Sequence, residues 1–172
     1  MKDITEMSVC NDALRPIYGP SSSHTYAPAR IAFYTRKCFG DLDDKFEVKI
    51  VFFGGKQMAF QGHMSDRAVI GGLLNFSPYD DSFEEVKKLE LEIKDELVYV
   101  KGRDTSFKFF INEKSEIPRA AFGIHIIVTD GSRKLKVEGR SIGGGDILID
   151  MVEPVEKRQP LQEIALRVSH KS

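Results

Sequence analysis

The second half of this chain reads as a series of short strands joined by tight turns, and no other feature constrains the fold as strongly. Five short runs of alternating or mainly apolar residues follow one another: Leu97–Lys101, Ser106–Ile111, Phe122–Thr129, Lys134–Arg140 and Ile147–Val152. A turn at Gly102–Asp104 joins the first two runs, and Asp130-Gly131 between the next two is a strong hairpin signal. Because strands joined by such short turns pair antiparallel, these runs predict a largely antiparallel sheet.

The first half combines one strong strand with helical patterns. The run Phe46–Phe53 alternates and then becomes fully apolar, which is typical of a central strand. Start and stop signals predict a helix with its cap near Thr25, a second over residues 65–75 capped by Ser65, and a third over residues 82–91. In the first of these, four residues recur at helical spacing: Ala27, Ile31, Tyr34 and Cys38. The fold class is therefore α+β, with a mixed or largely antiparallel sheet packed with helices.

Glycines in the second expected helix predict a close contact with a neighbouring element. Gly71 and Gly72 each weaken a helix by about 1 kcal/mol relative to alanine, so their presence favours tight packing at this point.

Length and charge narrow the class of protein. The chain has 172 residues, and we expect one domain over residues 1–153 with a polar tail or linker over residues 154–172. A net charge of -1 gives no support for binding nucleic acid or a polybasic attachment to membranes. No apolar run approaches the roughly 20 residues of a membrane span, and the start of the chain is not a signal peptide. We therefore expect a cytoplasmic protein, with Cys10 and Cys38 as reduced thiols that form no metal-ligand pair.

The first chemically distinctive segment is Ser21-Ser22-Ser23-His24-Thr25, directly after Gly19-Pro20. One hydroxyl is enough to cap one helix, so this run exceeds what capping requires. Hydroxyls and the free N–H groups of a helix start could hold a carboxylate or phosphate, and His24 could move a proton near neutral pH. The alternative is a Ser/Thr-rich loop that contains a capping residue.

A second histidine precedes the next expected helix. In Gly62-His63-Met64-Ser65-Asp66, the glycine allows close approach of the backbone, and Asp66 could orient the imidazole or favour the helix start. The alternative is an exposed histidine in a loop. Two histidines at small-residue turns entering helices could converge on one small anionic substrate. A Ser–His–Asp triad could be composed from Ser22, either histidine and Asp66, but no nucleophile elbow is present.

A third segment, Ser141-Ile142-Gly143-Gly144-Gly145-Asp146, joins two expected strands. Its spacing is neither that of a P-loop nor that of a dinucleotide fingerprint. Glycines allow positive φ angles and expose backbone N–H groups, which suits an anion, whereas the alternative is a tight or bulged connection. Of the other histidines, His125 is expected in the core or on a sheet face and His170 in solvent.

These three segments, in this order, resemble the β domain of the bacterial iron–sulfur L-serine dehydratases. That family shows Gly-Pro-Ser-Ser-Ser-His-Thr, then Gly-His-Gly-Thr-Asp, then Ser-Ile-Gly-Gly-Gly, and the resemblance spans about residues 6–152. The family's Gly-Thr corresponds here to Met64-Ser65, and its His-Pro-Asn segment to Ile117-Pro118-Arg119. The regulatory ACT domain that follows the glycine loop in many two-chain members is not expected here. The β domain is also similar in fold to the allosteric substrate-binding domain of some D-3-phosphoglycerate dehydrogenases.

The resemblance implies an enzyme of two parts. A separate α chain carries a 4Fe–4S cluster on three cysteines, and its open iron acts as a Lewis acid on the substrate L-serine. A base removes the α-proton, hydroxide leaves, and the resulting aminoacrylate hydrolyses to pyruvate and ammonia. This chain would bind no cluster itself, since its two cysteines cannot complete one. His24 and His63 are the implied proton-transfer or substrate-contact residues, with Asp66 as an orienting residue. The implied substrate-binding residues are Ser21, Ser22, Ser23, Thr25, Gly143 and Gly144.

Two functional hypotheses remain open at this point. In the first, the chain is the β subunit of an L-serine dehydratase and is inactive without its α chain. In the second, it is a stand-alone module that binds a small anion or amino acid and has no catalytic role. A homodimer would satisfy either, because a sheet of this size needs its second face or edge covered.

Overall fold

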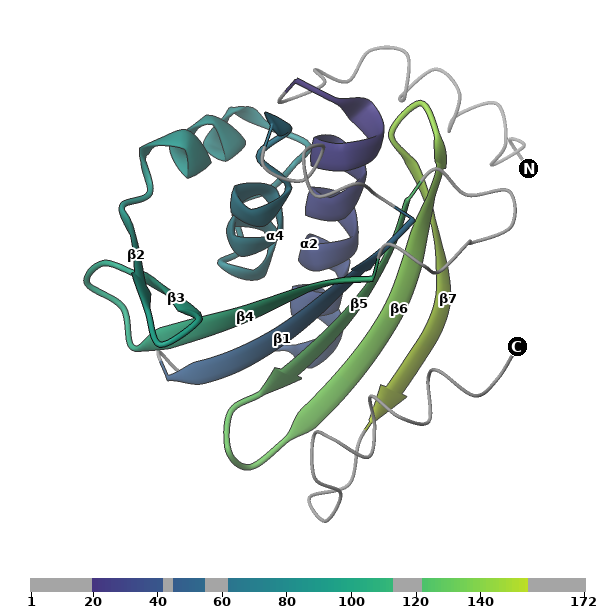
Figure 1. The fold of residues 1–172 in the computed structure, drawn as a ribbon. Helices are drawn as coiled ribbons and strands as arrows, with labels where there is room; N and C mark the ends of the chain where they lie inside the picture. The colour runs from purple at the N-terminus through teal and green to yellow at the C-terminus, as the bar shows by residue number, and fades with distance from the viewer. Residues whose placement is uncertain (1–19, 42–44, 55–61, 113–121, 155–172) are drawn as a thin grey trace.

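The frame of the protein is a seven-stranded sheet with the order β2-β3-β4-β1-β5-β6-β7 (Figure 1). The computed structural model describes residues 20–41, 45–54, 62–112 and 122–154. The strands are β1 (Phe46–Phe53), β2 (Leu91–Lys94), β3 (Leu97–Val100), β4 (Thr105–Asn112), β5 (Phe122–Thr129), β6 (Lys134–Gly143) and β7 (Asp146–Pro154). β1 and β4 pair parallel, and every other neighbouring pair is antiparallel. The prediction of an α+β fold with a mixed, largely antiparallel sheet and a central first strand is therefore confirmed.

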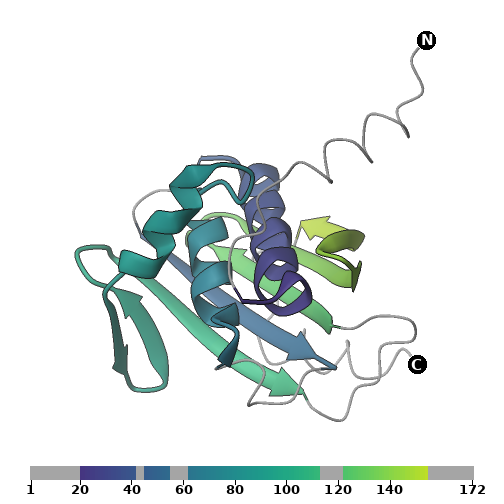
Figure 2. The same cartoon turned by 90° about the horizontal axis from the view of Figure 1, so that it is seen from above.

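The helices cover one face of this sheet, where α2 and α4 lie side by side (Figures 1 and 2). A single π-helical turn, η1 (Ser22–Tyr26), leads directly into α2 (Ala27–Phe39). The shorter helix α4 (Ser65–Leu73) and the 3₁₀ helix η2 (Asp81–Lys88) follow β1.

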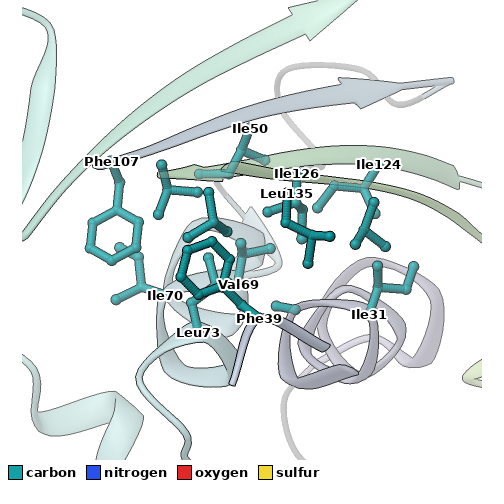
Figure 3. Close-up of a cluster of buried hydrophobic side chains, with 14 of the residues drawn as sticks. Ile31, Phe39, Ile50, Val69, Ile70, Leu73, Phe107, Ile124, Ile126 and Leu135 are labelled. Carbon is teal, nitrogen blue, oxygen red and sulfur yellow. The ribbon is translucent and has the colours of Figure 1, made fainter. Parts of the chain in front are cut away.

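The core lies between the helices and every second residue of the central strands, because successive side chains of a strand point to opposite faces (Figure 3). Ile50 on β1 and Ile124 and Ile126 on β5 meet Ile31 of α2 and Val69 of α4, and all five are fully buried. Each buried aliphatic side chain of this size stabilises the fold by roughly 1.5–3 kcal/mol. The opposite face of β5 carries His125, which contacts the Phe53 ring at a centroid distance of 4.3 Å.

The two glycines of α4 confirm the expected close packing. A Cβ atom on Gly72 would lie 2.5 Å from the carbonyl oxygen of Ala29 and 2.8 Å from the backbone nitrogen of Phe33, so α2 and α4 touch backbone to backbone. A Cβ atom on Gly71 would lie 2.4 Å from Val86 of η2. Helix α4 can therefore pack this closely against α2 and η2 only because these two positions lack side chains.

The expected start of the first helix is close to the observed one, because Tyr26, next to Thr25, is the N-cap of α2, although it makes no side-chain cap hydrogen bond. The π turn before it is capped by Ser21, whose hydroxyl accepts the N–H of His24. Two other expected helix starts and ends are wrong. Ser65 does not cap α4, since its buried hydroxyl donates to the carbonyl of His24. The third helix ends at Lys88 as a 3₁₀ helix, because Leu91 starts β2 and pairs with Val100.

The apolar stripe of the first helix and the start of the expected tail agree with the structure only in part. Ala27 and Ile31 of the first apolar stripe are buried, whereas Tyr34 and Cys38 are exposed. β7 continues to Pro154, the first residue of the expected tail. The remaining expectations lie outside the described residues: those on Cys10, Gly19, Ile117–Arg119, residues 155–172 and His170.

Candidate active site

Two histidine-bearing turns from distant parts of the chain meet at the start of the helical layer. His24 belongs to η1, and His63 to the turn before α4. Their imidazole centroids lie 5.2 Å apart with an interplanar angle of 47°. The two helices touch at their starts, and Gly72 near the end of α4 touches Ala29 and Phe33 further along α2. Helices α2 and α4 therefore run in the same direction, with their N-terminal turns together. The predicted convergence of the two histidines is thus present in the geometry, while their chemical role remains to be tested.

Hydroxyl groups connect the two turns through the backbone. The Thr25 hydroxyl donates to the carbonyl of His63, and the Ser65 hydroxyl donates to the carbonyl of His24. Thr25 is 2% exposed and Ser65 0% exposed. The Thr25 hydroxyl donates its proton inside the protein, and a role of Thr25 in binding a substrate carboxylate stays a prediction.

The surroundings of His24 favour a neutral imidazole. Partial burial lowers the pKa of His24 below its ordinary value, and repulsion by His63 lowers it further. Nδ1 of His24 lies 3.4 Å from the Ser21 hydroxyl, and the Phe122 ring meets the imidazole edge-on at a centroid distance of 5.2 Å. A neutral imidazole at pH 7 can accept a proton, so His24 has the protonation state that a general base needs.

His63 has an unused polar atom. Its Nδ1 is buried and has no hydrogen-bond partner in the part of the chain that the structure describes. A buried polar atom without a partner costs free energy, so such an atom at a candidate site suggests a ligand that completes it.

The serine turn keeps groups that suit an anion. Ser21, Ser22 and Ser23 are half-buried, and the first N–H groups of a helical turn have no partner within that turn. Ser21 uses its hydroxyl as a cap, which leaves the hydroxyls and amides of the next two serines as the stronger candidates for binding a carboxylate.

Asp66 lies in the first turn of α4, where a carboxylate favours the helix dipole. Among the described residues no hydrogen bond joins Asp66 to His24 or His63. The structure therefore does not assemble the Ser–His–Asp relay that the sequence allowed, and an orienting role for Asp66 stays a prediction.

The glycine loop turns β6 into β7 beside the serine turn. Gly143, Gly144 and Gly145 have φ angles of 105°, 62° and 88°, a region that favours glycine. A Cβ atom on Gly145 would lie 2.7 Å from the Tyr26 ring and 3.7 Å from Cβ of Ser22, so this loop rests on η1. A Cβ on Gly143 or Gly144 would meet nothing within 4 Å, so both face open space.

Sequence reasoning missed Arg30, which ties the glycine loop to α2. Its Nη1 donates to the carbonyl of Gly145 at 2.8 Å and pairs with Asp146 at 3.2 Å, while Nε donates to the Tyr79 hydroxyl at 3.3 Å. The guanidinium lies 5.6 Å from the ring centroids of both Tyr26 and Tyr79. An arginine in the first turn of a helix opposes the helix dipole, and that unfavourable placement was the available signal.

The described residues do not fit an iron–sulfur cluster. No group of three or more histidine, cysteine, aspartate or glutamate side chains comes together within them to hold a metal ion. Cys38, the described cysteine, lies exposed near the end of α2. Within the same residues, no helix is long and apolar enough to cross a membrane.

Comparison with known proteins places all three segments in one family. Residues 12–151 match the serine dehydratase beta chain family. The chain is 34% identical over 160 residues to the probable L-serine dehydratase beta chain of Bacillus subtilis, covering 92% of this chain and 66% of that protein. It is 38% identical over 77 residues to the L-serine dehydratase beta chain of Peptoniphilus asaccharolyticus, covering 42% of this chain and 34% of that protein. The chain therefore belongs to the serine dehydratase beta chain family.

Proposed function

We propose that this chain is the β subunit of an iron–sulfur L-serine dehydratase, a lyase that converts L-serine to pyruvate and ammonia. Family membership and the names of two relatives support this proposal. The single observation that carries it is the pair of imidazoles 5.2 Å apart, with serine hydroxyls on the same turn as His24 and a glycine loop that rests on that turn.

The chemistry of serine elimination fits two adjacent imidazoles. A base must take the proton from Cα, and the β-hydroxyl must leave with a proton or on a Lewis acid. Ser21 lies beside Nδ1 of His24, which leaves Nε2 to accept the α-proton from the substrate. His63 lies next to it, and its Nδ1, which has no hydrogen-bond partner among the described residues, would contact or protonate the substrate. Ser22 and Ser23 would hold the carboxylate.

The glycine loop would close the other side of the substrate. Gly143 and Gly144 face open space, so a compact ligand can approach their backbone. The short side chains and bare amides around the histidines favour a small substrate such as L-serine over a bulky one.

The cluster and its α chain complete the proposal from outside this chain. Because the described residues hold no ligand set for a cluster, the 4Fe–4S group would be carried by the α subunit and would supply a Lewis acid there. This chain would contribute substrate binding and proton transfer to the shared site, and would be inactive alone.

The test is co-expression with the cluster-bearing α chain of the same genome, followed by an anaerobic assay of pyruvate release from L-serine. We expect His24→Ala and His63→Ala to lower kcat by roughly 10²–10⁴-fold, the usual contribution of general acid–base groups. His125→Gln is the matched control, because His125 lies on the sheet face away from the helices. Absence of a brown complex and of pyruvate, or full activity of both alanine variants, would refute the proposal.

A second candidate is a stand-alone module that binds a small anion or amino acid. The hydroxyl-rich turn favours it, and so does Nδ1 of His63, which has no hydrogen-bond partner among the described residues. Both groups belong to this chain and need no second chain to form. Calorimetry on the chain alone with L-serine and inorganic phosphate separates the two. Tight binding of either ligand, with no partner chain to be found, would support the module; weak binding with activity in the complex would support the enzyme.

A further inference from the structure

We propose that Thr25 and Ser65 act as positioning residues, forming a reciprocal clasp that fixes the two histidines relative to each other within this chain alone. The clasp consists of two hydroxyl–carbonyl hydrogen bonds that cross between η1 and the turn before α4. Its importance for catalysis rests on the proposed function, whereas its geometry does not.

The two hydrogen bonds are reciprocal in the chain. Thr25 directly follows His24, and its hydroxyl donates to the carbonyl of His63. Ser65 lies two residues after His63, and its hydroxyl donates to the carbonyl of His24. Each histidine therefore has its own carbonyl held by the turn that carries the other histidine. Two crossed tethers restrain both the distance and the relative rotation of the two turns, which a single tether cannot do.

Burial gives these bonds their strength. Both hydroxyls are shielded from water, so breaking either bond leaves a buried donor without its partner. No water competes for the proton, and a hydroxyl has one proton to donate. The clasp is therefore a lasting part of the folded chain rather than a surface contact.

The backbone between His63 and Ser65 is shaped for this arrangement. Met64 adopts the left-handed conformation with φ 55° and ψ 33°, one of few non-glycine residues to do so in the described chain. This bend brings the His63 carbonyl and the Ser65 hydroxyl onto the same neighbour, η1. The resembling family has glycine at this position, which adopts that conformation without strain.

With the backbones held, little freedom is left to the rings. Each imidazole is attached to a residue whose carbonyl is tethered, so only its two side-chain torsions can still vary. The Phe122 ring, which is buried, meets the His24 imidazole edge-on and restricts it further. The pair is thus preorganised before a substrate or a second chain arrives, and preorganisation of this kind lowers the cost of reaching a reactive geometry.

The clasp can be tested in the full chain without its partner. The titratable group that faces His24 is His63 on the neighbouring turn, while Ser21 and Phe122 are its other contacts. Replacing His63→Gln should therefore raise the pKa of His24, and NMR titration of the imidazole signals measures this response. The response reports whether the two rings stay adjacent.

The variants are Ser65→Ala and Thr25→Val, with Thr35→Val as the matched control. Thr35 is also fully buried and donates its hydroxyl to a carbonyl, that of Ile31 at 2.9 Å, but within one helix. We expect the response of the His24 pKa to His63→Gln to be lost in Ser65→Ala and in Thr25→Val, and to be retained in Thr35→Val. Thr25→Ser, which keeps a hydroxyl, should restore it.

The outcomes separate this inference from the proposed function. An unchanged response in both Ser65→Ala and Thr25→Val would overturn the clasp, as would the absence of any response in the unmodified chain. If Thr25→Val does not fold, Ser65→Ala decides, since alanine is small and a good helix former. In the assembled enzyme, Ser65→Ala should lower kcat by roughly 10–100-fold with little change in KM, as expected for misplaced catalytic groups. A lost NMR response without dehydratase activity in any form would sustain the clasp and refute the enzyme.

Discussion

Gly72→Ala tests whether the contact between α2 and α4 sets the position of the histidine pair. An added Cβ atom would lie 2.5 Å from the carbonyl oxygen of Ala29, 2.8 Å from Cβ of Ala32 and 2.8 Å from the backbone nitrogen of Phe33. Two of these three atoms belong to the backbone of α2, which cannot rotate away as a side chain can. The helices must therefore separate, and each of them begins beside one of the two histidine turns.

The expected loss of stability follows from two opposing effects. Overpacking a tight contact costs about 1–3 kcal/mol, and a clash with backbone atoms belongs at the upper end of that range. Alanine favours a helix over glycine by about 1 kcal/mol, which offsets part of the cost. We therefore expect a net destabilisation of about 2 kcal/mol, corresponding to a fall in Tm of roughly 4–8 °C for a domain of this size.

The assay is urea unfolding followed by circular dichroism, with the NMR response of His24 measured on the same sample. The matched comparison is Gly71→Ala, in the same helix, whose Cβ would meet the Val86 side chain instead of backbone. In a Val86→Ala background the clash at position 71 is removed, so Gly71→Ala should become neutral or stabilising by up to about 1 kcal/mol. A Gly72→Ala protein as stable as the unmodified chain, with an unchanged His24 titration, would refute the reasoning.

Three further predictions concern other parts of the fold. Burial lowers the pKa of His125 to about 4, so the unfolded chain binds a proton that the folded chain does not as pH falls from about 6.5 towards 4. Stability should fall by up to about 3 kcal/mol over that window, and His125→Gln should flatten the dependence in urea titrations at several pH values. Arg30→Met should destabilise the fold by about 1–2 kcal/mol and speed amide hydrogen exchange in the glycine loop, and unchanged exchange would contradict the role given to Arg30. Met64→Asn should raise stability by about 0.5–1 kcal/mol because asparagine tolerates the left-handed conformation; a lower urea midpoint would contradict this.

Much of the fold follows from local pattern. The runs that form β1 and β4 to β7 are alternating or mainly apolar over six or more residues, so neighbouring residues are enough to predict their strand character. β2 is absent from the prediction because Leu91–Lys94 is a four-residue edge strand, too short for a period to show, and its first residue, Leu91, is expected at the end of a helix. The parallel pairing of β1 with β4 also escaped prediction, because the choice of partner depends on contacts between segments far apart in the chain.

The features of the candidate site also fall into those that local sequence determines and those that depend on contacts between distant segments. Sequence by itself determined that histidines, hydroxyls and glycines stand at three turns, since turn chemistry depends on adjacent residues. Only the tertiary structure decided what those groups do to one another. It brought His24 and His63 to 5.2 Å and turned Thr25 and Ser65 inward as donors to backbone carbonyls. It also placed Arg30 on the glycine loop. The physical reason is that a hydroxyl has one proton, and whether a substrate or a carbonyl receives it depends on which backbone packs nearby.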